Sequence, residues 1–151
     1  MSYDGNVFAA LMGVLAVVGV ILLIWLVINI VSLWRIFTKA DEAGWKSIIP
    51  IYNSYVQYSI TWNTKMFWVN IGLSIVSMIV SVIQNGNSSM ILTLISTIIS
   101  IASTVIFIIA SHKLSKAFGH GVGFTVGLVL LNPIFMLILA FGSSEYEGIP
   151  D

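Results

Sequence analysis

The chain has 151 residues, of which 58% are hydrophobic and 8% are charged, and its formal net charge is zero. A soluble domain carries about 25% charged residues, so a chain with so few cannot cover its surface in water and must face lipid. The absence of cysteine excludes disulfides, thiol catalysis and thiolate metal sites. We therefore expect an all-α membrane protein in which residues 1–151 form a single transmembrane domain.

The first predicted element is a transmembrane helix over residues 7–34. This stretch is almost wholly apolar and is longer than the roughly 20 residues that a spanning helix needs. The preceding residues, MSYDGN, are acidic rather than basic, unlike the start of a cleaved secretory signal. We expect the helix to be retained, with Ala9 and Gly13 spaced as in helix-packing motifs.

The segment AGWKSIIPIYNSYVQYSI, residues 43–60, follows this helix. Pro50 disfavours a continuous helix, at a cost of about 3 kcal/mol, and tryptophan and tyrosine prefer the headgroup zone of a bilayer. The pattern predicts an interfacial or re-entrant segment on the cytoplasmic side. A compatible hypothesis makes it a surface that recognises a partner or a lipid headgroup. The candidate residues of this recognition surface are Trp45, Lys46, Pro50, Tyr52 and Asn53.

Two further spans are predicted over residues 66–83 and 90–111, joined by the turn sequence QNGNSS. Each carries polar side chains at steps of three and four, which places them on one helix face. This candidate polar stripe consists of Asn70, Ser74, Ser77, Ser81, Ser96, Ser100 and Ser103. One interpretation is hydrogen-bonded packing between the two helices of a hairpin. The alternative is the lining of a path for a small solute. The predicted spans contain no charged residue of the kind that marks proton relays, which argues against a proton-coupled transporter but is compatible with a path for a neutral solute.

The fourth predicted span covers residues 122–141. Gly119, Gly123 and Gly127 recur every four residues, which predicts a groove into which another helix backbone packs. The pair Asn132-Pro133 interrupts the span. We expect a kink at this pair, and the alternative is a binding site at a discontinuous helix.

Basic residues determine the predicted orientation. They follow the first and third spans, at Arg35, Lys39, Lys46, Lys65, Lys113 and Lys116. The positive-inside rule places all of them in the cytoplasm. Four spans then put both termini outside.

No group of residues in the sequence predicts catalysis, a cofactor or a metal. His112 and His120 have no carboxylate nearby and no third ligand at metal spacing. The stretch GHGVGFTVG does not have the spacing of a dinucleotide-binding loop, and no strand precedes it. We expect no enzymatic activity and no nucleic-acid partner.

Two blocks of the sequence carry a family resemblance. WRIFTKADEAGWKSIIPIYNSYV (34–56) contains a G-W-K-x-x-I-P-x-Y-N motif, and KLSKAFGHGVGFTVGLVLLNPIFMLILAFGSSEY (113–146) contains a late F-G-x-x-x-G-F block. Together they resemble an uncharacterised family of small bacterial multi-pass membrane proteins, a domain of unknown function. Asp41 stands where that family more often has glycine, which we expect to stiffen the chain there.

The resemblance implies a protein of the bacterial cytoplasmic membrane, but it implies no activity. Similar segments occur in some signal-peptidase-like proteins; we expect no peptidase activity, because no Ser/Lys catalytic domain follows residue 141. The leading hypothesis is a non-enzymatic accessory or scaffold subunit that acts through helix packing, with itself or with another membrane protein. The alternative is a channel or carrier for a small solute, lined by the polar stripe.

Overall fold

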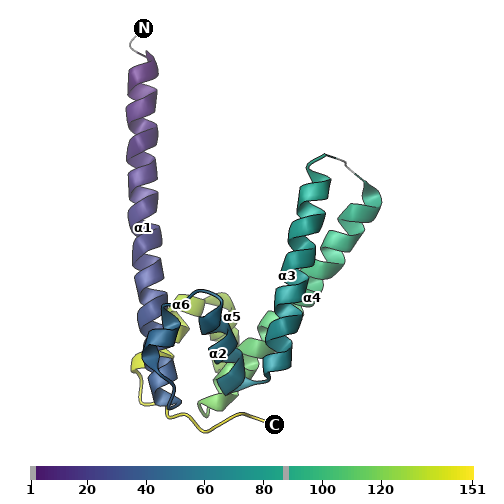
Figure 1. The fold of residues 1–151 in the computed structure, drawn as a ribbon. Coiled ribbons are helices and arrows are strands. Elements are labelled where there is room, and N and C mark those ends of the chain that lie inside the picture. The colour runs from purple at the N-terminus through teal and green to yellow at the C-terminus, as the bar shows by residue number, and fades with distance from the viewer. Residues whose placement is uncertain (1–2, 87–88) are drawn as a thin grey trace.

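The structure, a computed structural model, describes residues 3–86 and 89–151. These residues form helices and connecting segments, without strands (Figure 1). In chain order the helices are α1 (Tyr3–Lys39), the short 3-10 helix η1 (Gly44–Ser47), α2 (Tyr52–Thr61), α3 (Thr64–Gln84), α4 (Met90–Ala117), α5 (Val122–Leu130) and α6 (Asn132–Phe141).

Three of the described helices, α1, α3 and α4, are long and apolar enough to cross a membrane. They correspond to the predicted spans at 7–34, 66–83 and 90–111. The prediction of four transmembrane helices is wrong for residues 122–141, because two short helices occupy that stretch.

The two short helices, α5 and α6, form a hairpin that turns back instead of crossing. Leu131 between them is not helical, with φ −128° and ψ 48°, and Pro133 stands in the first turn of α6, where proline is favoured. His120 Nε2, before α5, lies 2.7 Å from Ser144 Oγ, after α6. A spanning helix would separate these two ends by about 30 Å. The break at Asn132-Pro133 is therefore a reversal of the chain and not the expected kink.

The segment 43–60 forms η1 and α2, each too short to span a bilayer. Ile51, between them, has a φ of 68°, a left-handed conformation that a β-branched residue rarely adopts. The Asn53 side chain donates a hydrogen bond to the Ser47 carbonyl at 3.3 Å, which ties the start of α2 to the end of η1. This segment, too, reverses without crossing.

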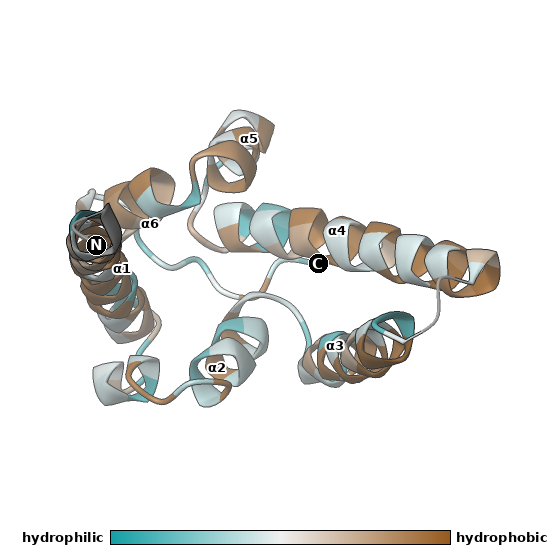
Figure 2. Ribbon diagram, turned by 90° about the horizontal axis from the view of Figure 1, so that it is seen from above, coloured by the Kyte–Doolittle hydropathy of each residue, from teal (hydrophilic) through white to brown (hydrophobic). Residues whose placement is uncertain are grey.

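The three long helices do not form one bundle. Among the described residues, α1 contacts η1, α2 and α6, but neither α3 nor α4. Figures 1 and 2 show α1 standing apart from the hairpin of α3 and α4. Residues 5–27 of α1 are all exposed, so this part of the helix, which we call the free half of α1, packs against nothing in the described chain.

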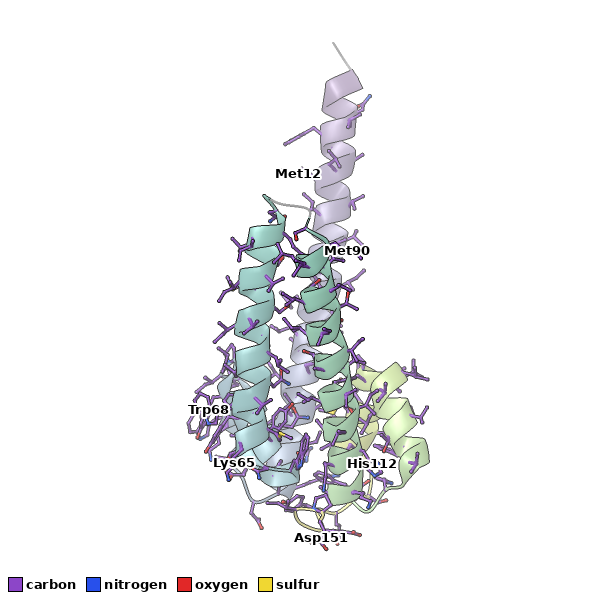
Figure 3. The ribbon with its side chains drawn as sticks, turned by 90° about the vertical axis from the view of Figure 1, so that its right-hand side faces the viewer. Met12, Lys65, Trp68, Met90, His112 and Asp151 are labelled. Atoms are coloured by element: carbon purple, nitrogen blue, oxygen red, sulfur yellow. The ribbon has the colours of Figure 1, made fainter. Side chains whose placement is uncertain are left out.

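The buried core lies at one end of the molecule, where the short helices gather. Its residues are Ile36, Phe37, Val56, Ile60, Leu114, Ala117, Phe118, Leu128, Met136, Leu139 and Ala140. Figure 3 shows Lys65, His112 and Asp151 at this end and Met12 far from it. Because α1 and α4 end here and α3 begins here, the basic residues of the chain also lie at this end, which we call the basic end.

Candidate functional site

Of the five candidate recognition residues, three are exposed and two form hydrogen bonds within the chain. Trp45 is 51% exposed, and Pro50 and Tyr52 are exposed as well. The Lys46 ammonium instead donates a hydrogen bond to the Glu42 carboxylate, and this bond raises the pKa of Lys46. The Asn53 amide is used in the contact with η1. Only the first three side chains are therefore available to a partner.

Two of these exposed residues belong to an aromatic groove beside α3. The groove has a volume of about 500 Å³ and is lined by Pro50, Ile51, Tyr52, Tyr55, Phe67 and Trp68. The ring centroids of Tyr52 and Tyr55 are 5.9 Å apart, and Phe67 meets Tyr55 edge-on at 5.4 Å. Such rings with polar tips suit the headgroup zone that the sequence predicts for this segment.

The glycine of the G-W-K motif has a packing role. A Cβ atom on Gly44 would collide with the indole ring of Trp34 in α1. Glycine at this position thus lets η1 approach α1 closely. This close approach explains the glycine of the motif without a partner.

The three candidate groove glycines do not share one helix. Gly119 lies before α5 with a φ of 72°, and a Cβ atom on Gly123 would meet nothing within 4 Å. A Cβ atom on Gly127, by contrast, would collide with the ring of Phe135 in α6. Gly127 is the one of the three at which another helix of the described chain, α6, packs closely.

The polar stripe lies mainly on exposed surfaces of α3 and α4. Ser74, Ser77, Ser81 and Ser100 are exposed, while Ser96 and Ser103 are half-buried. Two of these hydroxyls bond within their own helix: Ser74 donates to the Asn70 backbone carbonyl and Ser96 to the Thr93 carbonyl, both at 2.9 Å. One hydrogen bond joins the two helices, from Gln84 Nε2 to Ser96 Oγ at 3.4 Å.

The C-terminal residues form a strap across the basic end. Lys39 Nζ donates to the carbonyls of Leu139, Gly142 and Ser144 at 2.7, 2.8 and 2.9 Å. The Tyr146 hydroxyl donates to the Ile60 carbonyl at 2.6 Å, and burial raises the pKa of this tyrosine. The sequence analysis used Lys39 only to orient the chain. The Lys39 ammonium group holds α1, α6 and the strap together.

A polar cavity lies where five helices meet, and the sequence analysis did not predict it. Its volume is about 260 Å³. It is lined by Asn29, Leu33, Ser54, Gln57, Tyr58, Thr61, Asn70, Phe107, Ala110, Ser111, Leu114, Asn132 and Met136. Asn70 is the one member of the predicted polar stripe among them. The available signal was a lone asparagine in each of three apolar stretches, at positions 29, 70 and 132.

The two histidines bond to hydroxyl groups. His112 Nδ1 lies 3.0 Å from Thr125 Oγ1, which joins α4 to α5. His120 stacks on Phe124, with ring centroids 4.2 Å apart, in addition to its contact with Ser144. Both imidazoles therefore serve to hold the α5–α6 hairpin against its neighbours.

Comparison with known proteins places this architecture in a family. Residues 45–149 match the model of a protein family described as a family of unknown function (DUF5684). The chain belongs to this family. The part that matches DUF5684 runs from η1 through the strap and excludes α1. No curated protein and no solved structure matches the chain, so function has to be argued from the geometry.

Proposed function

We propose that this chain is a non-enzymatic subunit of an assembly in the bacterial cytoplasmic membrane, and that the free half of α1 packs against a transmembrane helix of another chain. That helix belongs to a second copy or to a different membrane protein. One observation carries the proposal: the free half of α1 contains glycines that no other part of the described chain contacts.

Gly5, Gly13 and Gly19 lie in this half, and a Cβ atom on any of them would meet nothing within 4 Å. A glycine inside a helix costs about 1 kcal/mol relative to alanine, so three of them need a reason. Lipid covers an apolar helix well enough that exposure alone requires no partner. Small residues, however, are what allow two helices to approach closely in a membrane.

Three spans change the proposed orientation. With the basic end in the cytoplasm, as the positive-inside rule favours, the N-terminus lies outside and the C-terminus inside. This replaces the expectation that both termini lie outside, which depended on a fourth span. The two termini lie at opposite ends of the molecule (Figure 1).

The alternative of a channel lined by the polar stripe has less support. Such a lining needs hydroxyls that face an enclosed space, whereas Ser77, Ser81 and Ser100 are exposed on α3 and α4. We therefore favour assembly over permeation through the α3–α4 hairpin.

Substitution of Gly13 tests the assembly role. Gly13→Ile adds bulk to the free half of α1, and Val14→Ile, at an adjacent exposed position, is the matched control. The mass of each purified complex in mild detergent is measured by light scattering, and its composition by mass spectrometry. We expect the unmodified chain and Val14→Ile to retain the same partner or copy number, and Gly13→Ile to lose it.

Purification of the unmodified chain as a monomer without a partner would contradict the assembly role. So would equal masses for both variants and the unmodified chain. The composition of the retained complex distinguishes self-association from a different partner protein.

A further inference from the structure

The polar cavity occupies the place where otherwise separate helices converge. Among the described residues α1 touches neither α3 nor α4, yet Asn29 of α1, Asn70 of α3 and Ser111 of α4 all line this one space. Residues from α2 and α6 complete the wall. The space has a volume of about 260 Å³ and is partly open, with half-buried polar side chains such as Asn29, Asn70 and Asn132 on its wall.

The cavity extends from the buried core at the basic end, to which its lining residues Leu114 and Met136 belong, as far as Asn29 on α1. Asn29 precedes Lys39 by about 15 Å along α1, at 1.5 Å per residue. Half of a hydrocarbon core is also about 15 Å, so with Lys39 at the interface the cavity would reach from the headgroup zone toward the midplane. Asn132, the first residue of α6 after the break at Leu131, lines the same cavity.

The carboxamides on the wall retain hydrogen-bonding capacity. Asn29 donates to the Trp25 carbonyl at 2.8 Å, Asn132 to the Leu128 carbonyl at 3.1 Å and Asn70 to the Tyr58 hydroxyl at 2.8 Å. Each bond uses a side-chain N–H group. Within the described residues the three side-chain oxygens accept no hydrogen bond from protein groups, and a carboxamide oxygen has two lone pairs.

The wall selects against charge. It contains amides, hydroxyls and apolar side chains, and no Asp, Glu, Lys, Arg or His is among the described residues that line it. A charged solute in this space would need an opposite charge or a metal to offset its desolvation. Leu33, Phe107 and Met136 give the remainder of the wall an apolar character, which suits the short carbon skeleton of a small solute.

We infer that this cavity is a binding site for a small uncharged molecule that both donates and accepts hydrogen bonds, of the polyol or carboxamide class. Asn29, Asn70 and Asn132 hold it through their side-chain oxygens, and the Gln57 amide faces the same space. The site is separate from the free half of α1, so it stands or falls independently of the assembly role.

The cysteine-free chain permits a direct test by thiol protection. Ser111→Cys places one thiol in the cavity wall, and Ser103→Cys, on the same helix but outside the wall, is the matched control. Both variants are reconstituted in liposomes and treated with the uncharged reagent 2-hydroxyethyl methanethiosulfonate. The modification rate is measured with and without glycerol, acetamide or, as a probe too large for the cavity, sucrose.

We expect the reagent to modify Ser111→Cys, and glycerol or acetamide to slow that reaction saturably. Protection follows 1 + [L]/Kd, so a probe at twice its Kd slows the rate about threefold. Sucrose should not protect, and no probe should protect Ser103→Cys. Adding Asn29→Leu to Ser111→Cys should remove the protection.

Three results would contradict the proposed binding site. They are a Ser111→Cys thiol that stays unmodified, a rate unaffected by both small probes, and equal slowing in the Ser103→Cys control. Because protection is measured on Ser111→Cys itself, the test does not depend on the folding of the Asn29→Leu variant.

Discussion

Asp41 ends α1 in a conformation that glycine adopts more easily. Its φ is 57°, and the next residue, Glu42, donates its backbone N–H to the Phe37 carbonyl at 2.8 Å. This is the hydrogen bond of a helix that closes with a left-handed residue, where glycine is the usual choice. From the family resemblance we expect Asp41 to stiffen the chain at this point. Its left-handed φ is the physical reason why glycine is favoured there.

Replacing Asp41 by glycine should therefore stabilise the protein. The left-handed conformation costs a residue with a Cβ atom about 1 kcal/mol, and Asp41→Gly removes that cost. The free energy of unfolding, measured by titration with denaturing detergent, should rise by a similar amount. Glu42→Gly is the contrasting variant: it loses the contact with Lys46 and should destabilise. A fall in stability for Asp41→Gly would show that its backbone is not strained.

Among the elements, the α5–α6 hairpin depends on one close contact. The ring of Phe135 lies against the backbone of α5 at Gly127, and Phe124 packs edge-on against the same ring at 5.0 Å. No side chain larger than hydrogen fits at Gly127 unless the ring moves. The contact is what lets two short helices pack side by side.

Alanine substitutions at the two α5 glycines should have opposite effects. Gly127→Ala forces the Phe135 ring away, and such overpacking costs about 1–3 kcal/mol. Gly123→Ala meets open space and should be neutral or stabilising by up to about 1 kcal/mol, the helix propensity difference. Thermal unfolding of both variants tests this contrast. Equal melting temperatures would mean that the contact at Gly127 is not the one that holds the hairpin.

The sequence predicts the helical content of the α5–α6 region, but not its path. A run of apolar residues has the same mean hydropathy whether it crosses or turns back. Asn132-Pro133 marks where a helix breaks, yet the pair does not determine the direction in which the chain continues. That direction depends on contacts between residues distant in sequence, such as His120 with Ser144. Local patterns carry no information about these contacts.

The polar cavity could not be predicted from the sequence for the same reason. Asn29, Asn70 and Asn132 are conspicuous as polar residues in apolar stretches, but their convergence on one cavity is a property of the tertiary structure. The regular spacing of the serine stripe was a stronger sequence signal, although most of those serines are exposed. Periodicity identifies a helix face without identifying what covers it.

In the proposed arrangement of the whole molecule, α1, α3 and α4 cross the membrane and the two short reversals do not, which leaves the termini on opposite sides. Residue 6 lies at the far end of α1 from the basic end, and the strap that contains Glu145 lies against the basic end. In that arrangement the odd number of crossings fixes this relation, whichever way the protein is inserted.

Single-cysteine variants should show on which side of the membrane each end of the chain lies. In intact spheroplasts a membrane-impermeant maleimide should label Asn6→Cys, whereas Glu145→Cys should react only after the membrane is permeabilised. Both side chains are exposed, so burial does not limit either reaction. Labelling of both positions at equal rates before permeabilisation would support a fourth membrane crossing.

The unequal lengths of the long helices have a consequence for the surrounding bilayer. The apolar stretch 7–34 of α1 is about 42 Å long, whereas α3, with 21 residues, is about 32 Å long, against a hydrocarbon thickness of about 30 Å. α3 matches this thickness almost upright, whereas α1 has to tilt or thicken the lipid around it. The protein therefore presents hydrophobic mismatch on one flank only. Lipids with longer acyl chains should relieve that mismatch at α1 while creating one at the α3–α4 hairpin.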